Sequence, residues 1–181
     1  MELTRRDLLK GAAALGAAAT VPLTAGGPAQ AQTTQKKELV VAQGGDISKF
    51  DPHFSTSSND IRVSFNIFDN LISRRPDGKL HPGLATEWKS QGPTTWAFKL
   101  RQGVKWHNGD PFSSADAKFS LERTWDPNVK TRVSTVFTTI DRIEAPDAAT
   151  LVIHTKKPDP LLPARLAFYG GQIVQIGRAH V

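Results

Sequence analysis

The chain has 181 residues, of which 39% are apolar, and its formal net charge is +6. This apolar content is enough for one or two modest domains with a hydrophobic core, so a disordered tail and a disulfide-stapled miniprotein are both excluded. The sequence contains no cysteine, which excludes disulfides, cysteine-ligated zinc, iron–sulfur clusters and thiol nucleophiles.

The N-terminus has the order of parts that is typical of an export signal. Arg5 and Arg6 precede an Ala- and Gly-rich apolar run, and Ala29 and Ala31 are small residues at the two positions that a signal peptidase recognises. The run is too short and too weakly apolar to span a membrane, which takes about 20 strongly apolar residues. We therefore predict a twin-arginine-type signal peptide over 1–31, engaged by the export machinery and cleaved after Ala31, and a periplasmic mature protein.

The basic residues of the remaining chain are scattered. They occur as the pairs Lys36-Lys37, Arg74-Arg75 and Lys156-Lys157. Such pairs do not form the continuous basic stripe that follows a phosphate backbone, so we expect no nucleic-acid partner.

The first elements of the mature chain are a predicted strand and a predicted helix. Residues 38–43 form a short apolar run that ends at Gly44-Gly45, which predicts a buried strand that leads into a loop. From Asn59 onward, apolar residues recur at helical spacing behind serines that could act as N-caps, which predicts an amphipathic helix. Its inner stripe would consist of Ile61, Phe65, Phe68 and Ile72.

The middle of the chain has the alternation of a strand and the residues of tight turns. Residues 74–79 carry a Pro-Asp-Gly sequence, which predicts a turn. Apolar and polar residues alternate over 96–101, which predicts a strand with one buried face. We expect residues 104–107 to continue this strand until the Asn-Gly turn at 108–109.

A second helix is predicted to begin after Ser113. Ser113 is the N-cap and Asp116 lies at the third helical position, which together form a capping box. The inner face of this helix would carry Ala117, Leu121 and Trp125. Further strands are predicted at 138–145 and 150–155, with a turn at 146–147 between them.

The stretch 98–112 concentrates polar residues and raises the question of a chemical site. His107 and Asp110 lie in the turn, but the histidines of the chain show neither HxH nor HExxH spacing. The sequence also lacks a Gly-x-Ser-x-Gly elbow and a P-loop. We therefore predict no catalytic residue, no metal site and no cofactor. An exported metal-dependent hydrolase that uses His107 and Asp110 is the alternative.

Three stretches in order resemble a known family. They are DP at Asp51-Pro52, IFDNLISRRPDGKLHPGLATEW at 67–88 and TTWAFKLRQGVKWHNGDPFSSADAKFSLER at 94–123. Together they resemble the family 5 extracellular solute-binding proteins, which are the peptide, oligopeptide and nickel receptors of ABC importers. The departures are small: Phe50 stands where Leu is usual, and Ala117 where Val is usual.

The resemblance implies an α/β fold of the type II periplasmic-binding-protein class. Residues 32–72 would begin lobe I, 73–167 would form its inserted β-rich subdomain, and 168–175 would return towards lobe I. Members of this family usually have several hundred residues, so we expect this chain to be an N-terminal fragment that lacks the second lobe.

The last six residues have a separate interpretation. Residues 176–181 are a translation of ATCGGAAGAGCACACGTC, which resembles a sequencing adapter, and we expect this tail to be non-native. A genuine polar C-terminal tail is the alternative.

The resemblance also implies a function and a set of site residues. The protein would be a non-enzymatic receptor that captures a small solute, with peptide as the first expectation, and delivers it to the permease and ATPase subunits of an ABC importer. In peptide-binding relatives, the loop after the first strand pairs with the ligand main chain. This assigns Gln43, Gly44, Gly45 and Asp46 to ligand binding, with an ordinary turn as the alternative, and places Tyr169 at the cleft entrance.

Overall fold

The structure is a computed structural model that describes residues 39–178. The chain divides into two units, Met1–Val40 and Val41–Val181, and the helices and strands of the described residues all lie in the second unit. The predicted signal peptide lies outside the described residues. Within the described range, no helix is both long and apolar enough to cross a bilayer.

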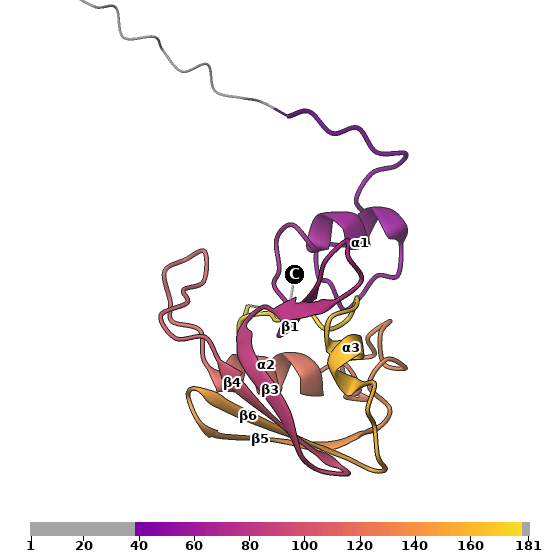
Figure 1. Ribbon diagram of the computed structural model, residues 1–181. Helices are drawn as coiled ribbons and strands as arrows, with labels where there is room; N and C mark the ends of the chain where they lie inside the picture. The colour runs from indigo at the N-terminus through magenta and orange to yellow at the C-terminus, as the bar shows by residue number, and fades with distance from the viewer. Residues whose placement is uncertain (1–38, 179–181) are drawn as a thin grey trace, which may run out of the picture. The chain divides into compact units, whose positions relative to one another are not determined.

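A four-stranded antiparallel sheet is the centre of the second unit (Figure 1). Its strands are β3 (Ala85–Gly92), β4 (Thr95–Leu100), β5 (Ile140–Asp147) and β6 (Thr150–Thr155), in the order β3-β4-β6-β5. The tight connections β3–β4 and β5–β6 make two hairpins, and β4 pairs with β6 to join them.

Apolar cross-strand pairs explain why β4 lies inside the sheet. Phe98 faces Leu151 and Trp96 faces Ile153, and Phe98 is 1% exposed. The predicted alternation over 96–101 is thus confirmed. Strand β3 was not predicted, because this edge strand is mostly polar and partly exposed and shows no apolar alternation.

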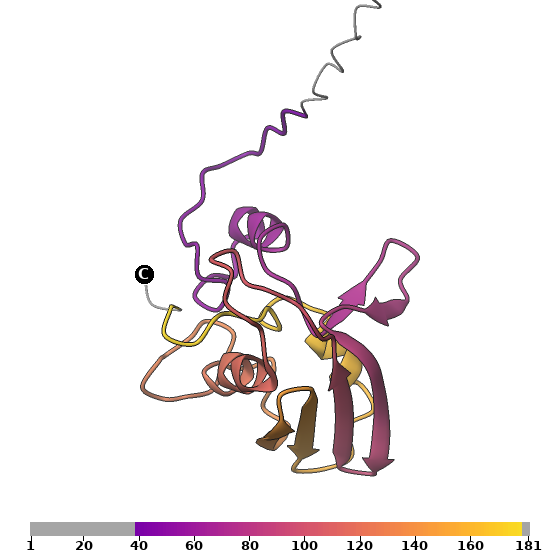
Figure 2. The same ribbon diagram turned by 90° about the vertical axis from the view of Figure 1, so that its left-hand side faces the viewer.

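The hairpin of β1 (Ile72–Arg74) and β2 (Leu80–Pro82) precedes the main sheet, and Figure 2 shows it projecting from the start of β3. Its turn is the predicted one. The Gly78 N–H donates to the carbonyl oxygen of Arg75 at 2.9 Å, and Gly78 has a φ of 77°, which a residue with a side chain adopts only at a cost.

The described residues also form three helices. They are α1 (Ser58–Ser64), α2 (Ser114–Glu122) and α3 (Leu162–Leu166). Helix α2 packs against β5 and β6, whereas α3 lies beside β1. Helix α3 was not predicted, because it is short and carries a proline in its first turn.

The start of α2 agrees with the predicted capping box. The backbone N–H of Ser113, the N-cap, donates to the Asp116 carboxylate at 3.0 Å. Ala117 and Leu121 are fully buried on the inner face. The helix ends at Glu122, so Trp125 lies beyond it, in a turn.

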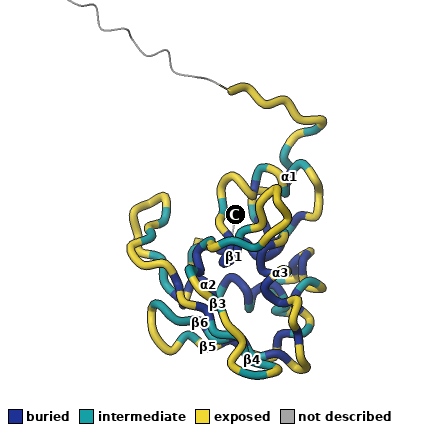
Figure 3. Tube along the Cα trace, in the orientation of Figure 1, coloured by how far each residue is buried: buried dark blue, intermediate teal, exposed yellow. Residues whose placement is uncertain are grey.

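The predicted strand over 38–43 is wrong. Leu39 is 85% exposed, Val40 and Val41 are also exposed, and residues 39–43 form no strand. A strand is stable only when a neighbour pairs with its backbone, and no other described residue pairs with this run. The apolar run therefore has strand propensity without a partner, and it is exposed as shown in yellow in Figure 3.

The predicted helix from Asn59 to Ile72 is shorter than expected. Helix α1 ends at Ser64, and Ile72 begins β1. The buried residues of α1 are Asp60 and Ser64, while Phe65 is 45% exposed. The helix turns its polar side inward because Asp60 binds the preceding loop, so the apolar stripe is not the buried face.

Two details of the turns also differ from the prediction. Residues 104–107 do not continue β4 but form only an isolated bridge between Lys105 and Pro111. The β5–β6 turn lies at 148–149, so Pro146 is part of β5. Pro146 lies in the irregularity between Glu144 and Asp147 of this edge strand, where it has no register partner on β6, so its missing N–H is tolerated.

Candidate functional site

The predicted ligand loop, Gln43–Asp46, is exposed except for Gly45, which is half-buried. Within residues 39–178, the backbone groups of these four residues make no hydrogen bond to the rest of the chain. The Asp46 carboxylate accepts a local bond from the N–H of Ile47 at 2.8 Å. The loop therefore presents main-chain donors and acceptors that are available to another molecule.

Asp60 of α1 holds the chain directly after this loop. Its carboxylate accepts the Ser48 N–H at 2.9 Å, the Ser48 hydroxyl at 2.6 Å and the Ser55 hydroxyl at 2.6 Å. Asp60 is 3% exposed, so these bonds satisfy a carboxylate that solvent scarcely reaches. The bond from the Ser48 hydroxyl is the largest cause that lowers the pKa of Asp60, followed by that from Ser55, so the group is ionised at neutral pH.

A buried charge network holds residues 51–54, which follow the loop Gln43–Asp46 by a few positions. Arg123, directly after α2, donates to both carboxylate oxygens of Asp51, at 3.2 and 2.8 Å. The Arg123 guanidinium also lies 5.6 Å from the centre of the Phe54 ring. Planar bidentate pairs of this kind are among the stronger polar contacts in proteins. The motif residues Asp51 and Pro52 thus lie where an ion pair joins the segment after the loop Gln43–Asp46 to the end of α2.

His53 is the third member of this network and is fully buried. Its Nδ1 lies 3.1 Å from an Arg123 nitrogen, and its Nε2 lies 3.0 Å from the carbonyl oxygen of Gln172. Because a guanidinium can only donate, Nδ1 accepts, and the proton of the neutral ring resides on Nε2. Burial, and next the charge of Arg123, lowers the pKa of His53 to about 4. The ring is therefore neutral at pH 7.

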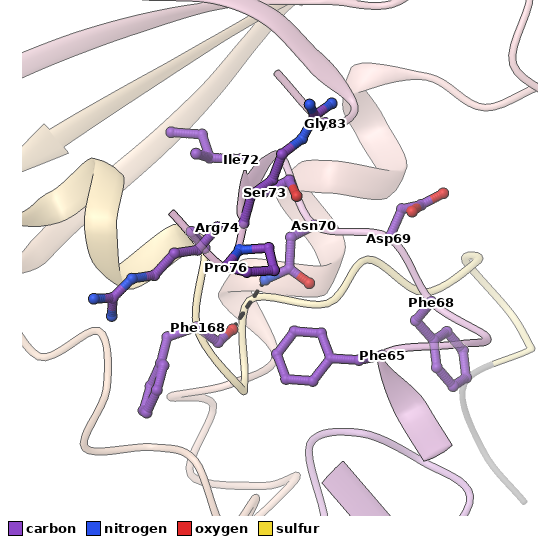
Figure 4. A pocket seen from close by; sticks show the side chains of 12 residues that line it. Phe65, Phe68, Asp69, Asn70, Ile72, Ser73, Arg74, Pro76, Gly83 and Phe168 are labelled. Carbon is purple, nitrogen blue, oxygen red and sulfur yellow. Dashed lines mark hydrogen bonds between the residues drawn. The ribbon is translucent and has the colours of Figure 1, made fainter. Parts of the chain in front are cut away.

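A cavity of about 550 Å³ opens between the β1–β2 hairpin and the segment after α3 (Figure 4). Phe65 and Phe168 lie on its walls, and Arg74 lies at the hairpin. The Asn70 amide nitrogen donates to the carbonyl oxygens of Leu166 and Phe168, both at 2.9 Å. The Asn70 Oδ1 is buried and has no partner among the described residues. The cavity thus has a mixed apolar and polar lining, and the Asn70 Oδ1 is a buried acceptor beside it.

The structure does not join the predicted site residues into one pocket. Tyr169 is half-buried, and its ring centre lies 4.5 Å from that of Phe168. Neither Tyr169 nor the loop Gln43–Asp46 lines the cavity of Figure 4. Phe65, Asn70 and Phe168 were not predicted as cavity residues, since a single sequence offers no signal that segments about 100 residues apart meet.

The turn that holds His107 is a structural feature of the chain. The Asn108 amide nitrogen donates to the Asp110 carboxylate at 2.7 Å, and the Gln175 amide nitrogen donates to the same carboxylate at 2.7 Å. Asp110 is thereby tied to the C-terminal segment. Across the described part of the chain, no group of three His, Asp or Glu side chains is placed to hold a metal ion.

Solved structures show where this architecture occurs. The murein tripeptide binding protein MppA of Escherichia coli superposes with a TM-score of 0.67 and 27% identity, over 71% of this chain and 29% of that chain. The mixed helix and strand architecture is therefore part of the type II periplasmic-binding-protein fold, as expected from the sequence.

The chain belongs to the bacterial extracellular solute-binding proteins, family 5, because residues 79–180 match the middle region of that family. Residues 2–22 match the twin-arginine translocation signal sequence, which confirms the predicted export signal. The family is one of solute-binding proteins and not of enzymes.

Two relatives illustrate the extent of the similarity. The periplasmic oligopeptide-binding protein OppA of Haemophilus influenzae is 30% identical over 151 residues, which cover 74% of this chain and 28% of the relative. The probable peptide ABC transporter periplasmic-binding protein y4tO of Sinorhizobium fredii is 33% identical over 177 residues, which cover 97% of this chain and 32% of the relative. The chain thus spans about a third or less of the length of these relatives.

Proposed function

We propose that the protein is the periplasmic substrate-binding component of an ABC importer and that its solute is a peptide. The observation that carries this proposal is the family match over residues 79–180, together with the peptide-binding relatives. The twin-arginine signal match supports export to the compartment in which such a receptor would work. Its partners would be the permease and ATPase subunits that complete the importer.

Within this chain, the loop Gln43–Asp46 is our proposed ligand contact. A peptide carries alternating main-chain donors and acceptors, and an exposed extended segment can bind it as an added strand. The backbone groups of the loop have no hydrogen-bond partner in the part of the chain that the structure describes, and its two glycines allow another backbone to approach closely. Tyr169 remains a proposed contact at the entrance to the same site.

A pair of substitutions at Gln43 tests main-chain recognition. Gln43→Pro removes the backbone N–H, whereas Gln43→Ala removes only the side chain beyond Cβ. If the loop pairs with the ligand backbone, Gln43→Pro weakens binding about tenfold, the value of one hydrogen bond of about 1.4 kcal/mol, and Gln43→Ala leaves it nearly unchanged. The measurement is calorimetric titration of the full chain with alanine peptides of two to five residues.

The same titrations can contradict the proposal. A full chain that binds none of these peptides would argue against peptide as the solute class. Peptides recovered as hydrolysis products would favour the hydrolase alternative. In that case His107→Ala and Asp110→Ala should each abolish the hydrolysis. Equal affinities of the two Gln43 variants would exclude pairing through this backbone N–H.

A further inference from the structure

The loop Gln43–Asp46 and the chain that follows it differ sharply in how they are held. The backbone of the loop makes no hydrogen bond to other described residues. Immediately afterwards, Ser48 donates twice to Asp60, through its N–H and its hydroxyl. The position of the loop Gln43–Asp46 is therefore set by the contacts of Ser48, which follows it in the sequence.

Asp60 accepts hydrogen bonds from both ends of the segment 48–55. Ser48 precedes it by twelve residues and Ser55 by five, and both hydroxyls reach the same carboxylate oxygen at 2.6 Å. The Ser55 hydroxyl also accepts the N–H of Ser57 at 3.0 Å, which continues the network to the start of α1. One buried side chain thus closes the segment 48–55 into a fixed loop.

A second contact from the same helix supports the loop itself. A Cβ atom added at Gly45 would lie 2.5 Å from the Asn59 amide nitrogen, so Gly45 lies directly against that side chain. At Gly44 an added Cβ would have no atom within 4 Å. Asn59 and Asp60, adjacent in α1, therefore support the loop at Gly45 and at Ser48.

We infer that Asp60 is a positioning residue for ligand binding, with Asn59 as its steric complement: together they hold Gln43–Asp46 in the conformation that a peptide backbone meets. This inference rests on the proposed function, because it assumes that the loop contacts the solute. Asp60 itself would not touch the ligand. Its substitution would act by letting the loop sample other conformations before binding, which lowers the apparent affinity.

The first test uses Asp60→Ala in the full chain, with Asp77→Ala as the matched control. Asp77 also accepts a backbone N–H, that of Lys79 at 2.9 Å, but in the β1–β2 turn. In Asp60→Ala, we expect the Ser48 amide to exchange with solvent at least about tenfold faster and the backbone order parameter at Gly45 to fall below about 0.6. Amides of β4 serve as the internal reference for folding.

A milder variant and a pair of glycine substitutions keep the test decisive even if Asp60→Ala does not fold. Ser48→Ala removes one hydroxyl bond and leaves the carboxylate in place, so we expect a smaller change in the same direction. Gly45→Ala should displace the loop or Asn59 and weaken binding of trialanine, whereas Gly44→Ala should not. Asp60→Ala should weaken binding of trialanine at least about fivefold, and Asp77→Ala should not.

The outcomes separate the two proposals. Unchanged exchange at Ser48 and unchanged order at Gly45 in Asp60→Ala would overturn the positioning role. Faster exchange with unchanged affinity for trialanine would also overturn it, because the loop would then move without consequence for binding. If the unsubstituted chain binds no alanine peptide, the proposed function fails. Equal effects of Gly44→Ala and Gly45→Ala on loop order would refute the support of the loop by Asn59.

Discussion

The sheet region and the N-terminal loop region are stabilised by different physics. Between the sheet and α2, side chains such as Phe98, Leu121 and Ile153 are buried in apolar contacts, which are non-directional and contribute stability in proportion to buried area. The segment 47–57 is instead held by Asp51 and Asp60, whose bonds are directional. Stability should therefore respond most to the sheet, and local backbone position to the carboxylates.

The largest expected loss of stability comes from the centre of the sheet. Phe98→Ala removes a ring that is 1% exposed and should lower the free energy of unfolding by about 3–5 kcal/mol, through lost burial and the cavity left behind. Urea unfolding followed by tryptophan fluorescence measures the change. The control is Phe50→Ala, at a ring that is 68% exposed, where we expect less than about 0.5 kcal/mol. Equal effects would contradict a core centred on β4.

The next effect should come from the ion pair behind the loop. Arg123→Met leaves the Asp51 carboxylate without its bidentate partner in a site where the arginine side chain is 2% exposed. Removing one partner of a buried pair typically costs about 3–5 kcal/mol, and we expect about 3 kcal/mol because Asp51 retains partial exposure.

The double variant Asp51→Asn with Arg123→Met isolates the unpaired charge as the cause. Because it removes the charge as well as its partner, it should recover part of the stability lost in Arg123→Met. A double variant less stable than Arg123→Met alone would show that the arginine acts mainly through other contacts, such as the Phe54 and Phe119 rings.

His53 makes the same region sensitive to acid. Its pKa is about 4 in the folded protein and near 6.5 in the unfolded chain, so the unfolded chain binds more protons between these values. The free energy of unfolding should therefore fall as the pH decreases from 6.5 to 4, by up to about 3 kcal/mol, and this contribution is fully present above pH 6.5. Unfolding curves at several pH values measure it.

A non-titrating variant assigns this pH dependence to one residue. His53→Gln should flatten the slope between pH 4 and 6.5, although it also lowers stability by disturbing the contacts with Arg123 and Gln172. A slope that persists in His53→Gln would place its origin in other groups.

The sequence predicted those parts of the fold that depend on local patterns, and failed where contacts between distant segments decide the structure. Local patterns predicted β4, the capping box of α2 and the turn at Gly78, because each depends on residues within a few positions of one another. The strand over 38–43 was wrong because its apolar run indicates propensity, and propensity becomes a strand only where another strand pairs with it. The helix from Asn59 was predicted too long because its apolar spacing continued past Ser64.

The candidate site was less predictable than the fold. The resemblance to the family pointed to the loop Gln43–Asp46, which is exposed except at Gly45 and whose backbone makes no hydrogen bond to another residue within 39–178. The sequence did not indicate Asp60, since a carboxylate in the first turn of a helix is ordinary and its contacts with Ser48 and Ser55 arise only on folding. Nor did it indicate that His53 would meet Gln172, which lies 119 residues away.

The smallest predicted effect compares the starts of the two longer helices. At α2, Asp116 accepts the N–H of Ser113 at 3.0 Å and that of Ile176 at 3.2 Å, whereas Ser57 before α1 makes no side-chain capping bond. Asp116→Ala should therefore cost about 1 kcal/mol in urea unfolding, and Ser57→Ala only a few tenths. If both cost the same, α1 depends on its N-cap as α2 does, and the claim that Asp60 rather than local capping holds the loop region would lose its support.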